Sequence, residues 1–501
     1  MRLSLASKVG LAALVWSLGT AVGRSQQTDQ QTANQPSGPA PASPQQPAAP
    51  TPPPGNSAPL GAPSVPAAQG ESTGTPAETP GPVDTRSLAG AEAITPTLPG
   101  SGRSYILPSF AVSQALDTNA QITPGASKTQ TATIPAGSLS LNHVGRRNLF
   151  SLDYRGGAII CETDSSLTTG FQELGFSDKY TGARWNFLIA DYLSFLPQTS
   201  LGFGGIGFGG GFTPQSLGLG SGTGLNAIYT PQGSILAGQA GTTTNTAIAQ
   251  AQYNLTPRSA LTAVGGFGLV YYSQAGLSSG NNTFATLAYD HQVTSFDTLT
   301  VAYTFSALRF NGGSEAINSY LLRLGYGHRV TGRLTLTLLG GPEYTESLVT
   351  GVSGVHRRWG GNGQVTLGYK VERGSLSADY RHYISLGSGV FTGAVTDTVG
   401  GSFNREISRT WNASMDLGYS HNAPLGTSSI NPNFANPGSF GYEYGSFRLA
   451  HTFSRSTRGF FFYSLEHQQS GAAYVPGNNS RVIIRNVFGI GLTVHPRPWP
   501  I

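Results

Sequence analysis

The chain has 501 residues, of which 38% are hydrophobic and only 11% charged, and its formal net charge is +5. Soluble domains carry roughly 25% charged residues, so this composition does not suit a surface that faces water on every side. The sequence has no run of Lys or Arg, and we therefore expect no nucleic-acid partner.

Residues 1–23 predict a secretory signal peptide. Arg2 and Lys8 provide a positive start, residues 9–22 form a short apolar core, and Ala21-Val22-Gly23 offers small residues for cleavage. No Cys follows the cleavage point, so a lipid anchor is not expected. No other apolar stretch is long enough to span a membrane as a helix, and any membrane insertion must therefore use strands.

Residues 24–100 consist largely of Pro, Gln, Ala, Ser, Thr and Gly and contain no aromatic residue. Such a segment buries too little apolar area to offset the entropy lost on ordering, so we expect a disordered linker. A periplasmic spacer is the plain interpretation. A docking segment for a periplasmic partner is the alternative, although no repeated motif supports it.

From residue 105 onward the chain alternates apolar and polar residues in long segments. In Trp411–Ser420 every odd position is apolar and every even position is polar or Gly. Side chains of a strand point to opposite faces in turn, so this pattern gives one apolar and one polar face. It predicts strands at 105–117, 132–143, 147–158, 166–178, 182–195, 241–255, 259–273, 281–293, 297–309, 317–329, 332–345, 358–371, 375–386, 391–406, 409–421, 441–455, 458–469 and 481–494.

The connections between these segments fall into two classes. Every second one is tight, as at Gly145-Arg146, Thr331-Gly332 and Arg455-Ser456-Thr457, whereas the others are longer and include 201–240 and 422–441. Membrane barrels show this asymmetry, with short periplasmic turns and long external loops. The sequence therefore predicts an all-β fold: a transmembrane antiparallel up-and-down barrel of about 18 strands (range 16–18) over residues 101–501, with both termini in the periplasm.

Aromatic residues support the same topology. Tyr253, Tyr289, Tyr326, Tyr369 and Phe453 fall on the apolar face just before tight turns, and Tyr271, Tyr344 and Tyr419 fall on it near the opposite end. Two such belts are typical of a wall that crosses a membrane. His291, His328 and His451 also fall on the apolar face near the tight turns, where we expect them to lie at the membrane boundary.

The last strand, Val482–Val494, alternates apolar residues around Gly and resembles the C-terminal signal of outer-membrane barrels. It lacks a terminal Phe or Trp, and residues 495–501 follow it. The chain from Tyr105 onward resembles the porin-like outer-membrane β-barrel proteins of Gram-negative bacteria, in particular uncharacterised ones with a Pro/Gln-rich leader. That resemblance implies a cell outer-membrane location, contact with outer-membrane lipid and recognition of the last strand by the barrel-assembly machinery.

Parity places a belt of charged residues on the polar face at roughly mid-strand depth. These pore-lining candidates are Arg155, Arg323, Arg381, Arg448, Arg485, Asp153, Asp416 and Glu466. Charges are costly in lipid and cheap in a water-filled lumen. They either bias permeating ions or pair with one another and brace the lumen, and both roles can hold together. Arg448 and Glu466, on adjacent strands, are one candidate pair.

No pattern predicts an enzyme, a metal site or a cofactor. Gly202, Gly204 and Gly207 match a nucleotide-binding spacing, but no helix follows them. Parity sends His382 outward and Asp379 inward, so these two do not converge. The single cysteine, Cys161, is expected to be a small residue near a strand end.

The leading functional hypothesis is a passive porin-like channel for small hydrophilic solutes, since natural barrels of this width leave an aqueous opening. An export pore for a polysaccharide-type polymer is one alternative. A non-conducting structural or surface barrel is another.

Overall fold

The computed structural model describes residues 104–120, 128–164, 168–196, 241–273, 277–310, 315–349, 355–389, 391–425, 438–470 and 482–501. The expected signal peptide and linker lie outside these residues, as do the Gly-rich connection 201–240 and most of the connection 422–441.

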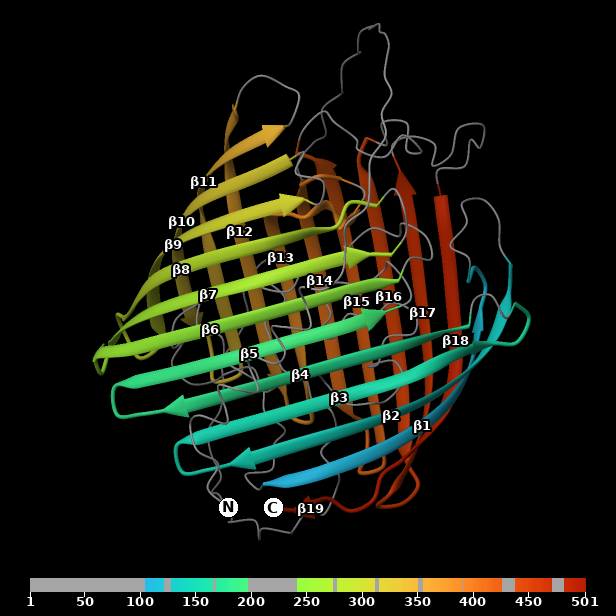
Figure 1. Cartoon of the computed structure of the whole chain (residues 1–501). Helices are drawn as coiled ribbons and strands as arrows, with labels where there is room; N and C mark the ends of the chain where they lie inside the picture. Colours follow the sequence, from blue (N-terminus) through green and yellow to red (C-terminus); the bar gives the residue numbers. More distant parts are fainter. Residues whose placement is uncertain are drawn as a thin grey trace, which may run out of the picture. The chain divides into compact units, whose positions relative to one another are not determined.

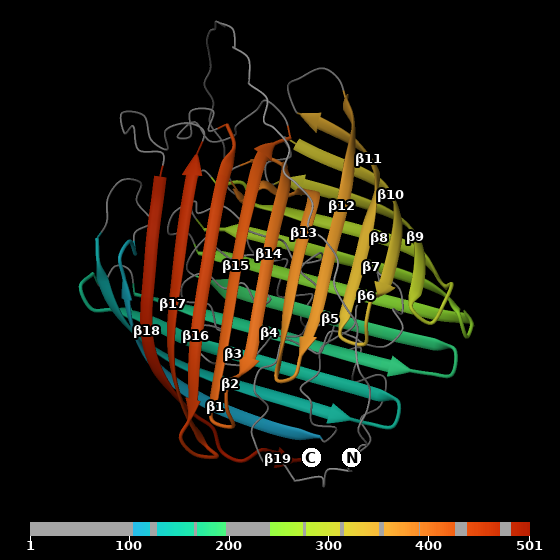
Figure 2. The same cartoon turned by 180° about the vertical axis from the view of Figure 1, so that it is seen from behind.

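The described part of the chain is built from eighteen long strands (Figure 1, Figure 2). They are β1 Tyr105–Asp117, β2 Gln130–Val144, β3 Asn148–Cys161, β4 Thr169–Thr181, β5 Trp185–Leu196, β6 Thr242–Thr256, β7 Ser259–Tyr272, β8 Gly280–Gln292, β9 Asp297–Phe310, β10 Glu315–Arg329, β11 Leu334–Val349, β12 Val355–Val371, β13 Gly374–Ser385, β14 Ala394–Glu406, β15 Trp411–Pro424, β16 Phe440–Thr452, β17 Thr457–Ser470 and β18 Val482–Val494.

Each strand pairs antiparallel with the strands before and after it in sequence, and β18 pairs with β1 to close the sheet. The closing register runs from Phe110 opposite Val494 to Asp117 opposite Val487. This confirms the predicted closed up-and-down barrel, and each predicted strand end lies within a few residues of the observed one.

The strand predicted at 391–406 starts three residues later than expected. The strand begins at Ala394, and residues before it form a short 3-10 helix, η2 Gly387–Gly389, and a turn. Gly387, Gly389 and Gly393 all have positive φ, a conformation that extended backbone does not adopt. A second addition is β19 Trp499–Pro500, in which the C-terminal tail pairs with Tyr105 and Ile106 of β1.

The two classes of connection are confirmed. Eight connections of two to four residues join β2 to β3, β4 to β5 and so on to β16 and β17, all at one end of the barrel. Tyr105, Val494 and β19 lie at that same end, because β1 and β18 begin and finish there. We call it the tight-turn end, and the other the long-loop end.

The outer face is apolar over most of its depth. Leu324, Val301, Leu287, Leu417 and Ile490 are among the many large hydrophobic side chains that stay exposed there. Rings gather near both ends: Trp185 packs on Tyr253 at the tight-turn end, and Tyr344 packs on Trp359 at the long-loop end. Such an outer face fits lipid. In the described part of the chain, no helix is long and apolar enough to cross a membrane.

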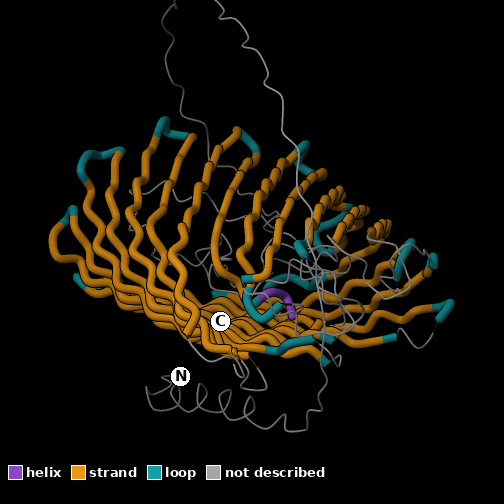
Figure 3. The backbone as a smooth tube through the Cα atoms, turned by 90° about the horizontal axis from the view of Figure 1, so that it is seen from above, coloured by secondary structure: helices purple, strands orange, loops and turns teal. Residues whose placement is uncertain are grey.

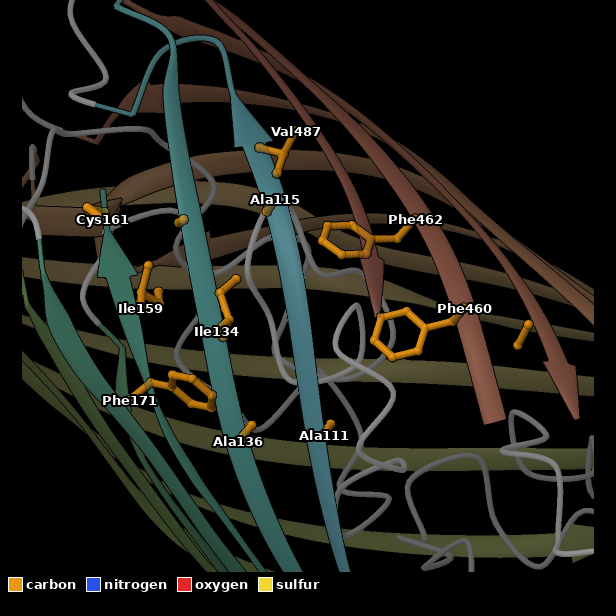
Figure 4. Close-up of a cluster of buried hydrophobic side chains, with 12 residues drawn as sticks. Ala111, Ala115, Ile134, Ala136, Ile159, Cys161, Phe171, Phe460, Phe462 and Val487 are labelled. Carbon is orange, nitrogen blue, oxygen red and sulfur yellow. The ribbon is translucent and has the colours of Figure 1, made fainter. Parts of the chain in front are cut away.

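The inner face is not uniformly polar. On β1–β4 and β16–β18 it carries a cluster of buried apolar residues that includes Ile134, Phe171, Phe460, Phe462 and Val487 (Figure 4). The Phe460 and Phe462 rings lie so close to Gly491 and Gly489 of β18 that a Cβ there would meet ring carbons at 2.3 and 2.2 Å. The alternating glycines of the last strand therefore leave room for rings that line the inner wall.

Adjacent residues of β12 test the two faces with the same new side chain. Val365 is exposed on the outer face between Leu338 and Tyr380, whereas Thr366 lies on the inner face between Thr337 and Asp379. We expect Val365→Arg to impair insertion, since a cationic side chain at the midplane of a barrel wall costs roughly 2–4 kcal/mol. Thr366→Arg should assemble nearly as well as the parent. Heat-modifiable electrophoretic mobility reports the folded fraction, and equal tolerance of both variants would contradict the face assignment.

Candidate lumen site

All eight charged residues predicted for the lumen lie on the inner face of their strands, but the structure does not gather them into one ring. Burial already separates them, since Arg485 and Glu466 are fully buried and Arg155 and Arg323 nearly so. Three local groups result: one at the closing strands, one on β3–β5 and one around a cavity on β8–β13.

The first group is a buried ion network that joins the closing strands. The Arg485 guanidinium donates from Nε and Nη2 to Asp117 Oδ2 at 2.9 and 2.6 Å, and from Nη1 to Glu466 Oε2 at 3.2 Å. Tyr442 Oη donates to Glu466 Oε1 at 3.4 Å. These residues come from β18, β1, β17 and β16, so the network connects the last strand to the first. Arg485 and Glu466 thus brace the wall.

The second group lies on neighbouring strands, β3 to β5. Arg155 of β3 is 3.8 Å from Glu173 of β4, and both side chains are buried. Tyr192 Oη of β5 donates to Glu173 Oε1 at 2.7 Å. Asp153 lies two residues from Arg155 on the same inner face. This group is also paired within the wall.

The predicted pair of Arg448 and Glu466 lies on the inner face of the adjacent strands β16 and β17. Arg448 lies opposite Phe462, and its guanidinium carbon sits 4.9 Å from the centre of the Phe460 ring, a cation–π distance. Glu466 lies opposite Tyr444, four residues from Arg448 in the register, and binds Arg485. Asp416 of β15 accepts a hydrogen bond from Ser446 Oγ at 3.4 Å.

The third group surrounds a cavity of about 140 Å³ on the inner wall of β8–β13. Arg323 and Arg381, two of the predicted residues, both line it together with Glu343 and Tyr383. Arg323 Nη2 donates to Thr304 at 3.3 Å, and Arg381 Nη2 lies 3.2 Å from Asp379 Oδ2. The Nε atom of Arg381 is buried and has no hydrogen-bond partner among the described residues. The cavity presents the guanidinium groups of Arg323 and Arg381 to a solute.

Glu343 was missed by the sequence reasoning. Its carboxylate accepts hydrogen bonds from Ser319 Oγ at 2.5 Å and from Asn362 Nδ2 at 3.2 Å. The alternation along 332–345 places Glu343 on the same face as Thr337, so parity alone would have found it. Asp117, at the end of its strand, and Glu173, in the middle of its strand, also fall on the inner face by alternation. They could have been predicted in the same way.

The described residues of the connection between β13 and β14, 386–389 and 391–393, turn into the barrel at the long-loop end (Figure 3). Ser278 N donates to Gly389 O at 2.7 Å, and the site of a Cβ on Gly389 lies 2.7 Å from the Tyr272 ring. The Phe391 ring is 5.6 Å from the Phe440 ring of β16. One short loop thus contacts the end of β7 with its following connection, and β16 on a separate part of the wall.

Apolar side chains form a layer around this loop. Leu308, Phe310 and Ile317 on β9 and β10 are buried, and Ile384, Leu386 and Leu425 pack against them. Phe391 is 1% exposed. This layer narrows the lumen at the long-loop end, beside a connection that the sequence predicted only as a link between strands 375–386 and 391–406.

The remaining predicted groups do not make an active site. His382 points outward with Asp397, at 2.7 Å from its Oδ1, whereas Asp379 points inward toward Arg381. The described residues contain no group of three or more His, Cys, Asp or Glu that could hold a metal ion. Cys161 is the last residue of β3 and is buried there, so its position at a strand end is as predicted.

No family model and no curated protein matches this chain. Among solved structures it is similar to OccK2 (OpdF) from Pseudomonas aeruginosa, at 8% identity and TM-score 0.39, over 78% of this chain and 98% of that one. OccAB4 from Acinetobacter baumannii is similar at 10% identity and TM-score 0.38, over 79% and 99%. The siderophore receptor PirA from Pseudomonas aeruginosa is similar at 9% identity and TM-score 0.34, over 78% and 80%. Resemblances this distant carry no argument about function.

The ion network at the closing strands makes a stability prediction. Arg485→Met leaves the carboxylates of Asp117 and Glu466 buried without their cation, and breaking a buried pair in this way costs about 3–5 kcal/mol. We expect the refolded barrel to unfold with a midpoint at a lower urea concentration. Tryptophan fluorescence measures the unfolding.

The matched control removes all three charges. The triple variant Arg485→Met, Asp117→Asn, Glu466→Gln should recover most of the loss, because neutral groups can occupy the same volume without an uncompensated charge. An unchanged midpoint in Arg485→Met would show that the network does not hold the closing strands together.

Proposed function

We propose that this protein is a porin-like channel of the bacterial outer membrane that passes small hydrophilic solutes. The observation that carries the proposal is the polar cavity at Arg323 and Arg381, on the inner wall of a barrel whose outer face is apolar. Barrels of 16–18 strands leave an aqueous channel, and a hydrated solute would meet these side chains as it crosses.

In the proposed channel, the inward loop between β13 and β14 determines which solutes can pass. It lies at the long-loop end with its apolar layer, beyond the polar cavity. A solute entering from that end must pass this narrowed region before it reaches the guanidinium groups. The long-loop end is the external end in this proposal, because membrane barrels keep their short turns in the periplasm.

The same loop favours a second candidate function, a non-conducting barrel. Phe391, Phe440 and Tyr272 are all buried around the loop, and two arginines of the inner wall, Arg485 and Arg155, are engaged in ion pairs. A barrel filled in this way has a structural role in the membrane. Export of a polymer has no support from the described residues.

Planar-bilayer conductance of the refolded protein separates the two functions. We expect discrete conductance steps for the parent protein, and larger steps for Phe391→Ala, because that substitution removes a ring from the apolar layer. Phe447→Ala is the control, since Phe447 lies on the outer face. Intact barrels of both the parent and the Phe391→Ala variant that show no conductance would reject the channel and leave the structural function.

A further inference from the structure

The wall of the barrel separates between β12 and β13 at the long-loop end. Pairing of these strands stops at Gly363 opposite His382. On the other sides, β11 stays paired with β12 as far as Val355, and β13 stays paired with β14 as far as Ser385. Residues 360–362 of β12 and 383–385 of β13 could form three more residue pairs in the same register. The two strands are not paired at these positions. We call this gap the β12–β13 seam.

Two successive positions at the seam edge of β12 carry no side chain on either face. Gly360 and Gly361 follow one another there, and a Cβ built on either meets no atom within 4 Å. On the β13 side, Ile384 packs against Leu308 and Ile317 of the inner wall. The end of β13 is therefore drawn into the lumen while β12 continues past it, and this displacement opens the wall.

The polar cavity lies directly behind the seam. Its lining includes Asn362 and Gly363 from the β12 edge and Arg381, Tyr383 and Ile384 from the β13 edge. Arg381 and Arg323 both belong to this lining. A molecule lying in the seam thus meets two guanidinium groups at its inner end.

The outer side of the seam opens onto an apolar belt. Phe305, Tyr320, Tyr344 and Trp359 stand directly opposite one another on β9–β12, and Trp359 is 71% exposed. One step deeper, Leu322 and Tyr303 are exposed in the rows that lead to Gly361. Rows of rings mark the boundary of the hydrocarbon layer, so the seam meets lipid at that boundary.

The size of the cavity restricts what fits. A cavity of roughly 150 Å³ holds a molecule the size of benzene, and the cavity here is about 140 Å³. It accepts a polar head group but not a long alkyl chain. The chain of an amphipathic molecule has to leave through the seam, past the two glycines and toward the apolar belt. The lining holds two guanidinium groups and one carboxylate, and Asp379 pairs with Arg381 beside it; an anionic head would bind these guanidinium groups.

We propose that the β12–β13 seam is a lateral binding site for a long-chain carboxylate, with its head group at Arg381 and Arg323 and its alkyl chain extended through the wall into lipid. His382, Tyr380 and Asp397 form a hydrogen-bonded polar group on the outer face beside the seam. Polar groups therefore flank the route on both sides of the wall. The head-group end of the site is the same arginine cavity that the proposed channel presents to solutes, whereas its outer end lies in the wall.

The test uses the full-length mature protein in detergent micelles, with Trp359 as the one remaining tryptophan and the others replaced by Phe. The probe is 9,10-dibromostearate, whose bromines quench a tryptophan on contact. We expect saturable quenching of Trp359 by dibromostearate and only weak, unsaturable quenching by its uncharged methyl ester. A matched protein that keeps Trp185, at the tight-turn end, should show unsaturable quenching with both probes.

Two substitutions locate the site. Gly361→Leu fills the seam, and Arg381→Gln removes the charge-assisted donor; each should weaken the apparent affinity for dibromostearate about tenfold or more. Gly401→Leu is the control, because Gly401 lies on β14 away from the seam and a Cβ there makes an ordinary 3.6 Å contact. Heat-modifiable mobility confirms that each variant is folded.

Three outcomes overturn the proposal. The first is equal and unsaturable quenching of Trp359 and Trp185, which would mean that the probe only dissolves in the micelle. The second is saturable quenching by the methyl ester as strong as that by the acid. The third is an affinity left unchanged by both Gly361→Leu and Arg381→Gln. None of these bears on conductance, so the channel function stands or falls separately.

Discussion

Backbone hydrogen bonding in a medium without water is the constraint on which the rest of this structure depends. Each unsatisfied N–H or C=O group in hydrocarbon costs several kcal/mol, so a sheet that crosses a membrane has to close on itself. Closure between β1 and β18 meets this requirement. It also forces every strand to present one face outward and one inward, which is why a two-residue alternation runs through the sequence. The outer apolar wall and the inner charged groups are two consequences of the same closure.

Closure leaves a weakest point where the ends of the chain meet, and the buried ions concentrate there. Arg485 on the last strand binds Asp117 on the first, and Glu466 on β17 binds the same guanidinium. Burying three charges is costly unless they are mutually paired. Here the three side chains are positioned for pairing by strands that backbone hydrogen bonds already hold in place. The network therefore favours one register for β18 on β1, a register that backbone bonds alone would leave free to slip by two residues.

The strands were predictable because alternation is a local signal, repeated in every segment. The same parity placed His382 and Asp379 on opposite faces, Tyr344 outward and Arg485 inward, all as observed. Contacts between distant segments left no such signal. Nothing in the sequence around Phe391 shows that its ring meets Phe440, and the positive φ angles of Gly387, Gly389 and Gly393 are indistinguishable in sequence from the many glycines of ordinary turns. Parity likewise assigned Arg448 and Glu466 to one face, but the four-residue offset between them in the register of β16 and β17 cannot be read from the sequence.

The inward loop and the β12–β13 seam have a common origin. Drawing residues 386–393 into the lumen pulls the end of β13 after them, and Ile384 packs on Leu308 and Ile317 instead of continuing the wall. The edge of β12 that this exposes runs from the long-loop end past the row of rings to Asn362, which lies opposite Gly341 near the middle of β11. Backbone groups left unpaired in hydrocarbon are costly, so the deeper part of this edge needs partners from the lumen side. The arginine cavity lies on that side, with Asn362 and Gly363 in its lining.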